Sequence, residues 1–540
     1  MSRRVLCYSP GRTPFQRLMA DAVDSGVLDS VDGRFLHGEL SIECLTVPTP
    51  EEVLASLARD YVHLLVVDLR GGVEAISRGR ALLDVLDNPD DVEARYGFHR
   101  IIALVSGDDA QAVDRLTVEL GRRGIGTVLR EYPDEPEGAF ALVVVMEVIR
   151  QLAKRIPGKT AVAASGGGVT GIYFELGALK CLDDCMTPGV NQLDMFFGIS
   201  AGAVVTSMLV QGYSPDEIMA AIAGHGGGRV PRLDLRLLRL GHLNFPDLGR
   251  RMWAATDVLW RALYDVAWHR SLPSANDLFL DYTSLVGPPL RSDGFERVLS
   301  ELFSRAGTTN DFRELPRPLF VGASDQDARR PVVFGSEEYD YIPISLAVQA
   351  SLSVNPAFAA VQIDGRYYED GAVTRTSDFV EAIERGADLV LVVDPFLPYV
   401  SRQVGANNRR GILYNIDQDI RSMSYTRFEN TRNWVLRQRP EVSSYTFLPS
   451  NRVRRILSVN PMDHRPFLAI WKGAYLSTFQ RIERLSHRMR GDFAVHGIKL
   501  ELDRARAVAD RLARTADPAF ADFFPDARVE LRTPPLCRTH

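Results

Sequence analysis

Apolar residues in the first part of the chain fall into short continuous runs separated by longer mixed stretches. The runs are Arg4–Tyr8, His63–Asp68, Ile101–Ser106 and Ile125–Leu129. The mixed stretches carry apolar residues at helical spacing and cover Pro14–Val23, Pro50–Ala58, Val73–Leu86, Ala110–Arg123 and Ala139–Ala153. Continuous apolar strands that alternate with helices indicate a parallel sheet with helices on both faces. Residues 1–153 are therefore predicted to form an α/β domain.

The same alternation begins again after Lys154–Lys159 (KRIPGK), whose Pro-Gly pair is typical of a domain boundary. Predicted strands are Thr160–Ala164, Leu193–Ile199, Leu319–Ala323, Val332–Phe334, Val361–Ile363 and Leu389–Asp394. Predicted helices are Ile172–Asp184 and Ala203–Gln211. We expect a second α/β domain over residues 160–400, interrupted by a helical insertion at 229–318 that is a candidate lid. Residues 401–540 are predicted to be a mainly helical C-terminal region.

Composition and charge exclude several classes of protein. Apolar residues make up 46% and charged residues 24% of the 540, which is ordinary for a folded globular chain. The formal net charge of −6 gives no overall cationic field, so we expect no nucleic-acid partner. Five cysteines without a CxxC pair predict neither a disulfide framework nor a metal held by cysteine.

The sequence also bears on location. The longest apolar run, Ala139–Ile149, is too short to span a bilayer and contains Glu147. The first residues, MSRRVLCYSP, lack the apolar segment of a secretory signal. We therefore expect a cytoplasmic protein.

A glycine-rich loop, Gly166–Gly171 (GGGVTG), follows the first strand of the second domain and opens a helix. Consecutive glycines let backbone N–H groups point at a ligand, and a helix N-terminus adds partial positive charge. Such a loop suits a phosphate or the oxyanion of an acyl-transfer intermediate. The glycines also fit the G-x-G-x-x-G dinucleotide fingerprint, which requires an acidic residue at the end of the next strand. That strand ends at Ser200 and has Asp194 at its start, which disfavours the dinucleotide alternative.

Two further motifs carry candidate catalytic side chains. Gly198–Gly202 (GISAG) stands between a predicted strand and a predicted helix, the context of a nucleophile elbow. Ser200 is then the candidate nucleophile, and the N–H of Ala201 would join the glycine loop as an oxyanion donor. Asp370 begins Asp-Gly-Ala far downstream, where an Asp-Gly pair taken alone is more often a turn.

Taken together, SGGGVTG, GISAGA and EDGA resemble the motifs of the patatin-like phospholipases, in the same order. The segments LFVGASD, VQASLSVNPAF and GADLVLVVD also resemble that family, and the likeness covers about residues 160–395. It implies a three-layer α/β hydrolase domain with a Ser–Asp dyad that needs no histidine, metal or cofactor. By position, Ser200 would be the nucleophile and Asp370 its base. The resemblance assigns the remaining oxyanion-hole N–H groups to Gly166, Gly167 and Gly168.

Three of the five tryptophans, Trp253, Trp260 and Trp268, fall in one predicted helix with a narrow polar stripe. Two interpretations stay open, a core helix and a lid or interfacial helix that meets a bilayer. Arg229–Arg251 adds local positive charge that favours anionic headgroups. Peripheral membrane contact through residues 229–270 is therefore an expectation beside the cytoplasmic location.

The N-terminal domain resembles a response-regulator receiver, which implies a flavodoxin-like parallel sheet. Asp68 ends a central predicted strand and Ser106 ends the following one. A working receiver also has an acidic pair after its first strand and a lysine after its last, and this chain has Cys7-Tyr8-Ser9 and Arg130 there. We expect a receiver-like domain that is not phosphorylated and that serves packing or binds a protein partner.

The sequence thus predicts a lipid acyl hydrolase of the phospholipase A or lysophospholipase type. It would cleave the carboxylic esters of a lipid or phospholipid through an acyl-enzyme on Ser200. Two alternatives stay open. One is a catalytically silent signalling or scaffold protein with a patatin-like domain, and the other is a soluble short-chain carboxylesterase.

Overall fold

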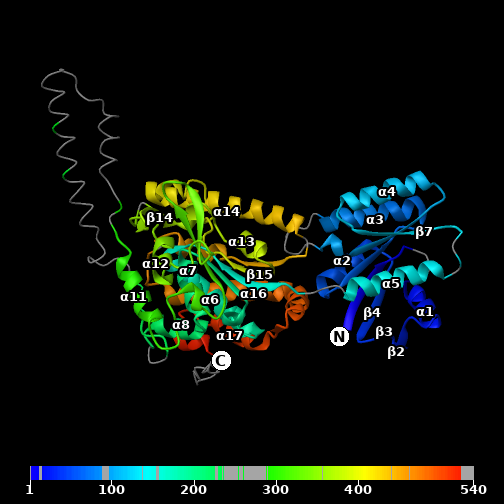
Figure 1. The fold of residues 1–540 in the computed structure, drawn as a ribbon, viewed down its shortest axis with the longest axis horizontal. Helices are drawn as coiled ribbons and strands as arrows, with labels where there is room; N and C mark the ends of the chain where they lie inside the picture. The colour runs from blue at the N-terminus through cyan, green and yellow to red at the C-terminus, as the bar shows by residue number, and fades with distance from the viewer. Residues whose placement is uncertain are drawn as a thin grey trace, which may run out of the picture. The chain divides into compact units, whose positions relative to one another are not determined.

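The computed structural model describes residues 2–10, 15–87, 96–134, 136, 138–153, 157–225, 229–233, 235, 253, 260, 288, 290–355, 357–439, 441–460 and 462–524. The chain divides into two compact units. Unit 1 comprises Met1–Gly158, Asn433–Ser444 and Ile482–Leu500. Unit 2 comprises Lys159–Arg432, Tyr445–Arg481 and Glu501–His540. Each unit contains a sheet with helices packed against it (Figure 1).

Unit 1 is built on a seven-stranded sheet in the order β2-β3-β4-β1-β5-β6-β7. The strands are β1 (Ser2–Tyr8), β2 (Asp29–Val31), β3 (Arg34–His37), β4 (Leu40–Val47), β5 (Leu64–Asp68), β6 (Ile101–Ser106) and β7 (Thr127–Glu131). From β4 to β7 all neighbours are parallel, and their order is the flavodoxin-like 2-1-3-4-5 order. The flavodoxin-like sheet expected from the sequence is confirmed. The antiparallel strands β2 and β3, which extend its β4 edge, were not predicted.

Five helices cover the two faces of this sheet. Alternate residues of a strand point to opposite faces, and apolar residues on both faces pack against helices. The helices are α1 (Phe15–Asp24), α2 (Pro50–Arg59), α3 (Gly72–Asp87), α4 (Ala110–Arg122) and α5 (Ala139–Ala153). Val5 and Cys7 of β1 pack with α1 and α5, whereas Leu6 and Tyr8 pack with α2, α3 and α4. Figure 1 shows α3 and α4 on one side of the strands and α1 and α5 on the other.

Unit 2 contains an eight-stranded sheet in the order β13-β14-β11-β10-β8-β15-β16, with β12 paired to β11. The strands are β8 (Lys159–Ala164), β10 (Met195–Ile199), β11 (Leu319–Asp325), β12 (Arg330–Phe334), β13 (Val361–Ile363), β14 (Arg366–Asp370), β15 (Ala387–Val393) and β16 (Ser443–Phe447). Its helices before residue 400 are α6 (Gly168–Cys185), α7 (Ala201–Val210), α8 (Pro215–Ala223), α11 (Asp293–Phe303), α12 (Ile344–Ser351) and α13 (Phe379–Glu384). Strands β11, β10, β8 and β15 are parallel, and β14 runs antiparallel to β11.

The chain after residue 400 is mainly helical, as predicted, with α14 (Ile412–Gln438), α15 (Asn451–Leu457), α16 (Phe467–Val495) and α17 (Asp503–Arg514). It does not form a unit of its own, because its residues are divided between units 1 and 2. Within unit 2, α16 packs closely on α6: a Cβ added to Gly177 would lie 2.8 Å from the Cβ of Ala474.

The predicted helical insertion at 229–318 is described only in part. Helix α11 lies in its C-terminal portion. The tryptophan-rich stretch and most of the predicted membrane contact at 229–270 lie outside the described residues. Trp253 and Trp260 are described, and their side chains are exposed.

Candidate active site

Ser200 occupies a sharp turn between β10 and α7. Its backbone has φ +54° and ψ −117°, a conformation that non-glycine residues rarely adopt. Glycines on both sides permit the turn. A Cβ added to Gly198 would lie 2.6 Å from the Cα of Ala203, and one added to Gly202 would collide with the carbonyl oxygen of Ala164. The turn therefore has the strand–serine–helix geometry that the sequence predicted for a nucleophile elbow.

Asp370 reaches Ser200 through the register of three neighbouring strands. Ile199 pairs with Gly322 of β11, and Ala323 pairs with Asp370 at the end of β14. The residues after Ile199 and at the end of β14 therefore meet at one edge of the sheet. Small residues allow this approach, because a Cβ on Gly322 would lie 2.8 Å from Cγ1 of Ile199, and one on Gly371 would lie 2.5 Å from the carbonyl oxygen of Gly322.

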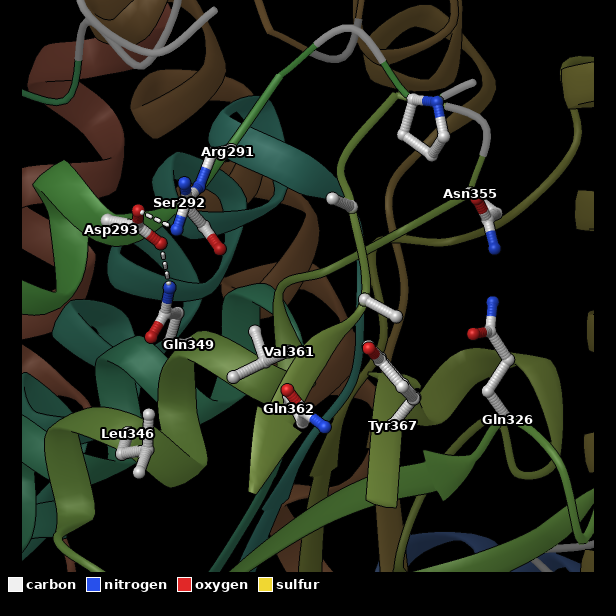
Figure 2. Close-up of a pocket in the computed structure, with 13 residues that line it drawn as sticks. Arg291, Ser292, Asp293, Gln326, Leu346, Gln349, Asn355, Val361, Gln362 and Tyr367 are labelled. Atoms are coloured by element: carbon white, nitrogen blue, oxygen red, sulfur yellow. Dashed lines mark hydrogen bonds and ion pairs between the residues drawn. The ribbon is translucent and has the colours of Figure 1, made fainter. Parts of the chain in front are cut away.

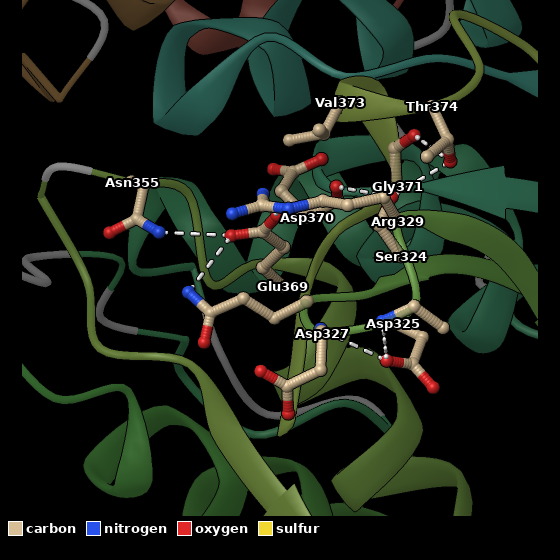
Figure 3. Close-up of polar contacts among 12 residues, drawn as sticks. Ser324, Asp325, Asp327, Arg329, Asn355, Glu369, Asp370, Gly371, Val373 and Thr374 are labelled. Carbon is tan, nitrogen blue, oxygen red and sulfur yellow. Dashed lines mark hydrogen bonds and ion pairs between the residues drawn. The ribbon is translucent and has the colours of Figure 1, made fainter. Parts of the chain in front are cut away.

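The carboxylate of Asp370 accepts a hydrogen bond from the side chain of Ser200. Its Oδ1 also accepts from the backbone N–H of Ala372 at 2.8 Å. The main chain of Asp370 is fixed as well. Its N–H donates to the carbonyl of Ser353 at 3.0 Å, and its carbonyl accepts from the Ser324 hydroxyl at 3.1 Å. Figure 3 shows Ser324 bridging to this loop beside Thr374.

Burial sets the protonation of this carboxyl group. Asp370 is 2% exposed, and desolvation raises its pKa to about 6, against the opposing hydrogen bonds from Ser200 and Ala372. A carboxylate with a pKa just below neutral is still mostly ionised at pH 7, and it is a stronger base than an exposed aspartate. The group can therefore accept a proton from the hydroxyl that it contacts.

The glycine loop lies against Ser200. A Cβ added to Gly166 would lie 3.3 Å from the Cβ and 3.8 Å from the Oγ of Ser200. Gly167 caps α6, and Gly168 begins that helix with φ +65°. Close packing excludes a side chain at Gly167, where a Cβ would lie 2.9 Å from Pro395. The structure thus brings the predicted loop and the predicted nucleophile together.

Helices α6 and α7 both begin at this edge of the sheet. The first N–H groups of a helix have no acceptor within the helix, which makes those of Gly168 and Ala201 suitable donors to an anion. The strands that precede the two helices are parallel neighbours, with Gly198 paired to Ala164. The edge therefore brings together the candidate nucleophile, the candidate base and the candidate N–H donors.

One contributor to the elbow was not predicted. The N–H of Ser200 donates to Oγ of Ser351 at 2.8 Å, and this hydroxyl donates in turn to the carbonyl of Gly322 at 2.6 Å. Ser351 thus ties the strained turn to β11. It lies in the segment VQASLSVNPAF, which the family resemblance had marked without assigning a role to any of its residues.

A second buried carboxylate precedes Asp370 in β14. Glu369 is 2% exposed and accepts hydrogen bonds from Asn355 at 2.9 Å and Gln326 at 3.3 Å, and it forms an ion pair with Arg329 at 3.1 Å. Figure 3 shows Asn355 and Arg329 on either side of Glu369. The cluster therefore fixes the end of β14, next to the candidate base Asp370 in the same strand.

Asn355 and Gln326 also line a cavity of about 650 Å³ between α11, α12 and the β13–β14 hairpin (Figure 2). Within it Gln349 donates to Asp293 at 2.9 Å, and Asp293 pairs with Arg291 at 2.7 Å. Ser200 and Asp370 are not among the residues that line it. The cavity is polar and lies on the Glu369 side of β14.

In unit 1 the carboxylate of Asp68, at the position that resembles the phosphorylation site of a receiver, is bound by other side chains of the unit. Arg70 donates to both of its carboxylate oxygens, at 2.9 and 3.0 Å, and Ser9 donates at 3.1 Å. Arg70 also pairs with Glu131 at 3.1 Å. Asp68 and Arg70 are both buried. An internal cation therefore neutralises the position where a receiver would carry its phosphate.

Two other kinds of feature are absent from the described part of the chain. No group of three or more histidine, cysteine or acidic side chains is arranged to hold a metal there. No helix among these residues is long and apolar enough to cross a membrane.

Residues 162–383 match the family model of the patatin-like phospholipases. This segment has the sequence of a patatin-like phospholipase domain, and the match supports a lipid hydrolase at the level of the family. It spans Ser200, Asp370 and the glycine loop, and the family predicted from their motifs is confirmed.

No curated protein matches the chain. The crystal structure of VipD from Legionella pneumophila is 17% identical, with a TM-score of 0.32 over 62% of this chain and 67% of that one. The crystal structure of the type III effector protein ExoU is 13% identical, with a TM-score of 0.24 over 67% of each chain.

Proposed function

We propose that the protein is a lipid acyl hydrolase of the phospholipase A or lysophospholipase type, working through a Ser200–Asp370 dyad. The observation that carries this proposal is the meeting of the Ser200 side chain and the buried Asp370 carboxyl at one edge of the sheet, through the register of β10, β11 and β14. A serine hydroxyl becomes a nucleophile when a positioned base can take its proton.

In the first half-reaction, Oγ of Ser200 attacks the ester carbonyl while its proton passes to Asp370. The developing oxyanion would accept hydrogen bonds from N–H groups of Gly166, Gly167, Gly168 and Ala201. Collapse of the tetrahedral intermediate breaks the ester C–O bond, and Asp370 returns the proton to the leaving alcohol. The fatty acyl group then remains on Ser200 as an ester.

In the second half-reaction, water loses a proton to Asp370 and attacks the acyl carbonyl. Collapse breaks the bond to Ser200, which regains the proton, and the fatty acid leaves. No histidine, metal or cofactor enters this cycle, because one carboxylate serves as base and then as acid in both halves.

A fluorophosphonate probe tests the dyad directly, because it reports a serine that is already activated. Wild type should gain the mass of one adduct, and Ser200→Ala should gain none. Asp370→Asn should react about 100 to 10,000 times more slowly, the usual contribution of a positioned base. A folded wild type that gives no adduct, with or without liposomes, would favour the catalytically silent alternative.

Substrate choice needs a second assay. We propose a lipid rather than a short-chain ester as the substrate, on the basis of the family match at residues 162–383. Long-chain phospholipid in vesicles should therefore be hydrolysed faster than a short-chain ester at equal ester concentration. The reverse order of rates would favour the soluble short-chain carboxylesterase. For the location of the activity we propose the cytoplasm, at a membrane surface.

For unit 1 we propose a receiver-like domain that binds a protein partner or serves packing, without phosphorylation. The contact that supports this is the pairing of Asp68 with Arg70. The carboxylate is already bound by a cation, and the chain supplies no acidic pair at Cys7-Tyr8-Ser9 to hold Mg²⁺.

A further inference from the structure

Helix α14 presents apolar side chains to solvent. Ile416, Ile420 and Met423 are 46%, 41% and 65% exposed. Their spacing of four and three residues places them on one side of the helix. The side chains that α14 buries are on its other side, and include Gln418, Arg421, Ser424 and Phe428. The exposed stripe is therefore not the face by which α14 packs on unit 2.

Positive charge lies in the loop that precedes α14. Residues 400–427 contain five arginines against two aspartates. Arg402, Arg409 and Arg410 are exposed, and no carboxylate forms an ion pair with them among the described residues. The start of this loop is tied to the buried side of α14, because the N–H of Tyr399 donates to Oε1 of Gln418 at 2.7 Å.

Arg410 and two apolar residues of the loop add to the exposed surface near the start of α14. The guanidinium of Arg410 lies 4.9 Å from the ring centroid of Tyr414, at the start of α14. Val400 and Val404, in the same loop, are 58% and 96% exposed. Exposed apolar side chains on α14, with exposed arginines in the loop before it, suit a surface that is both apolar and anionic.

The exposed apolar stripe of α14 ends close to the candidate active site. Arg427, one turn beyond Met423, donates to the carbonyls of Ala372 at 3.0 Å and Val373 at 3.2 Å. The N–H of Ala372 in turn donates to Asp370. The Cβ of Ala372 lies 3.8 Å from the position that a Cβ of Gly166 would take. Helix α14 thus contacts the rim of the site directly.

We propose that these residues form a membrane-docking surface that binds an anionic lipid bilayer and sets the loop after Asp370 at the interface. The α14 surface comprises Val373, Ile416, Ile420 and Met423 with Arg402, Arg409 and Arg410. This inference rests on the proposed lipid hydrolase function, and it names the surface through which the protein would reach lipid substrate in a bilayer. It lies apart from the tryptophan-rich stretch at 229–270.

The test measures binding without catalysis, by flotation of full-length Ser200→Ala protein with vesicles. Vesicles of phosphatidylcholine mixed with phosphatidylserine should carry the protein upward, and vesicles of phosphatidylcholine alone should carry much less. Raising the salt should weaken binding, because exposed charges are screened. Failure to float with the anionic vesicles overturns the inference.

Two triple variants separate the apolar and basic parts. Ile416→Ser/Ile420→Ser/Met423→Ser should lower vesicle binding at least about tenfold, through lost apolar burial. Arg402→Gln/Arg409→Gln/Arg410→Gln should lower it by about fivefold for each charge that contacts the surface. Met423→Ser alone, at the most exposed position of the three, serves if the apolar triple variant does not fold.

Matched controls come from exposed residues elsewhere in unit 2. Val459→Ser removes a side chain that is 67% exposed. Arg297→Gln/Arg305→Gln/Arg514→Gln removes three exposed charges. Both controls should float like the parent. Equal losses in controls and test variants would contradict a localised surface.

Two further outcomes would also overturn the inference. One is a dimer that the apolar triple variant disperses, since the stripe would then be an interface between copies. The other is vesicle binding that all variants retain. A wild type that floats and gives no fluorophosphonate adduct would refute the dyad proposal and leave the docking surface standing.

Discussion

Ser200 and Asp370 are each held in a state that a free polypeptide avoids. Ser200 has a positive φ, which costs about 1–3 kcal/mol for a residue with a side chain. Asp370 keeps a carboxylate in a buried position that raises its pKa to about 6. The surrounding fold stabilises both states. The Ser351 hydroxyl accepts a hydrogen bond from the N–H of Ser200, and the register of β10, β11 and β14 holds Asp370 in place.

The pKa of Asp370 predicts how rate depends on pH. The base works only when it is ionised, so kcat/KM should rise about tenfold per pH unit below about 6 and level off above it. Initial rates on a water-soluble ester between pH 4.5 and 8 would show the step. A profile that is flat through this range would contradict Asp370 as the base.

The same shift predicts a stability change in Asp370→Asn. The pKa is raised in the folded state from 3.8 to about 6, so the folded chain binds this proton more tightly than the unfolded chain. The free energy of unfolding of wild type therefore falls as the pH rises from about 4 to about 6, and it stays at the lower value above pH 6. At 1.36 kcal/mol per pKa unit the effect is about 3 kcal/mol. The variant, which lacks the titration, should gain stability relative to wild type between pH 4 and pH 7.

Thermal midpoints of the two proteins at several pH values would test this. Ser324→Ala, which leaves the Asp370 carboxyl in place, is a control whose difference from wild type should not follow pH in this way. A difference between wild type and Asp370→Asn that stays constant with pH would show that the carboxyl is not perturbed by burial.

Single residues of the site were predictable where a short motif fixes them. The strand–glycine–helix and strand–serine–helix patterns placed Gly166 and Ser200 because their geometry is local. Ser351 could not be placed in this way. Its contact with Ser200 joins residues 151 positions apart, and only the folded sheet brings them together. The partners of Glu369 were missed for the same reason.

At the scale of elements, α6 is held by a buried ionic network as well as by apolar packing. Lys180 is fully buried and pairs with Asp184 at 2.7 Å and with Asp216 of α8 at 3.1 Å. Tyr475 of α16 and Arg504 of α17 also bond to Asp184, at 2.8 and 2.9 Å. The C-terminal helices therefore belong to the same packed structure as the helix that opens the glycine loop.

Removing the lysine should destabilise this structure strongly. Lys180→Met leaves buried carboxylates without their central cation, which costs about 3–5 kcal/mol. Denaturant unfolding followed by tryptophan fluorescence would measure the loss, since Trp471 is buried in α16. Lys159→Met is the matched control, because Lys159 is exposed and should change little. Equal midpoints for the two variants would refute a structural role for the network.

The strands that the sequence failed to predict share a physical reason. Continuous apolar runs identified β5, β6, β10 and β15, which are covered on both faces. Strand β4 (LSIECLTV) alternates apolar and polar residues and is only partly buried, so it has no such run. Strand β14 (RYYED) ends in two acidic residues that are buried only because Asn355, Arg329 and Ser200 provide partners. Such strands become recognisable only with their neighbours.

At the scale of the whole molecule, unit 1 combines the flavodoxin-like strand order with an Asp68 carboxylate that is paired with Arg70, and we expect no phosphorylation. Incubation with acetyl phosphate and Mg²⁺ should leave its intact mass unchanged, because Arg70 already binds the Asp68 carboxylate. A phosphate adduct on wild type that Asp68→Asn lacks would contradict this prediction. A receiver that is known to accept phosphate from the same reagent is the positive control.

The chain passes between its two units five times, at 158/159, 432/433, 444/445, 481/482 and 500/501. The later passages supply residues that unit 1 uses. Tyr61 donates to Asp492 at 2.9 Å, and a Cβ on Gly491 would overlap the Tyr61 ring. A protease that nicks the chain between Ala153 and Gly158 would therefore separate two fragments on a denaturing gel without releasing a complete unit 1. A single cut in the chain can therefore neither add nor remove the whole flavodoxin-like unit, because its three segments are separated by parts of unit 2.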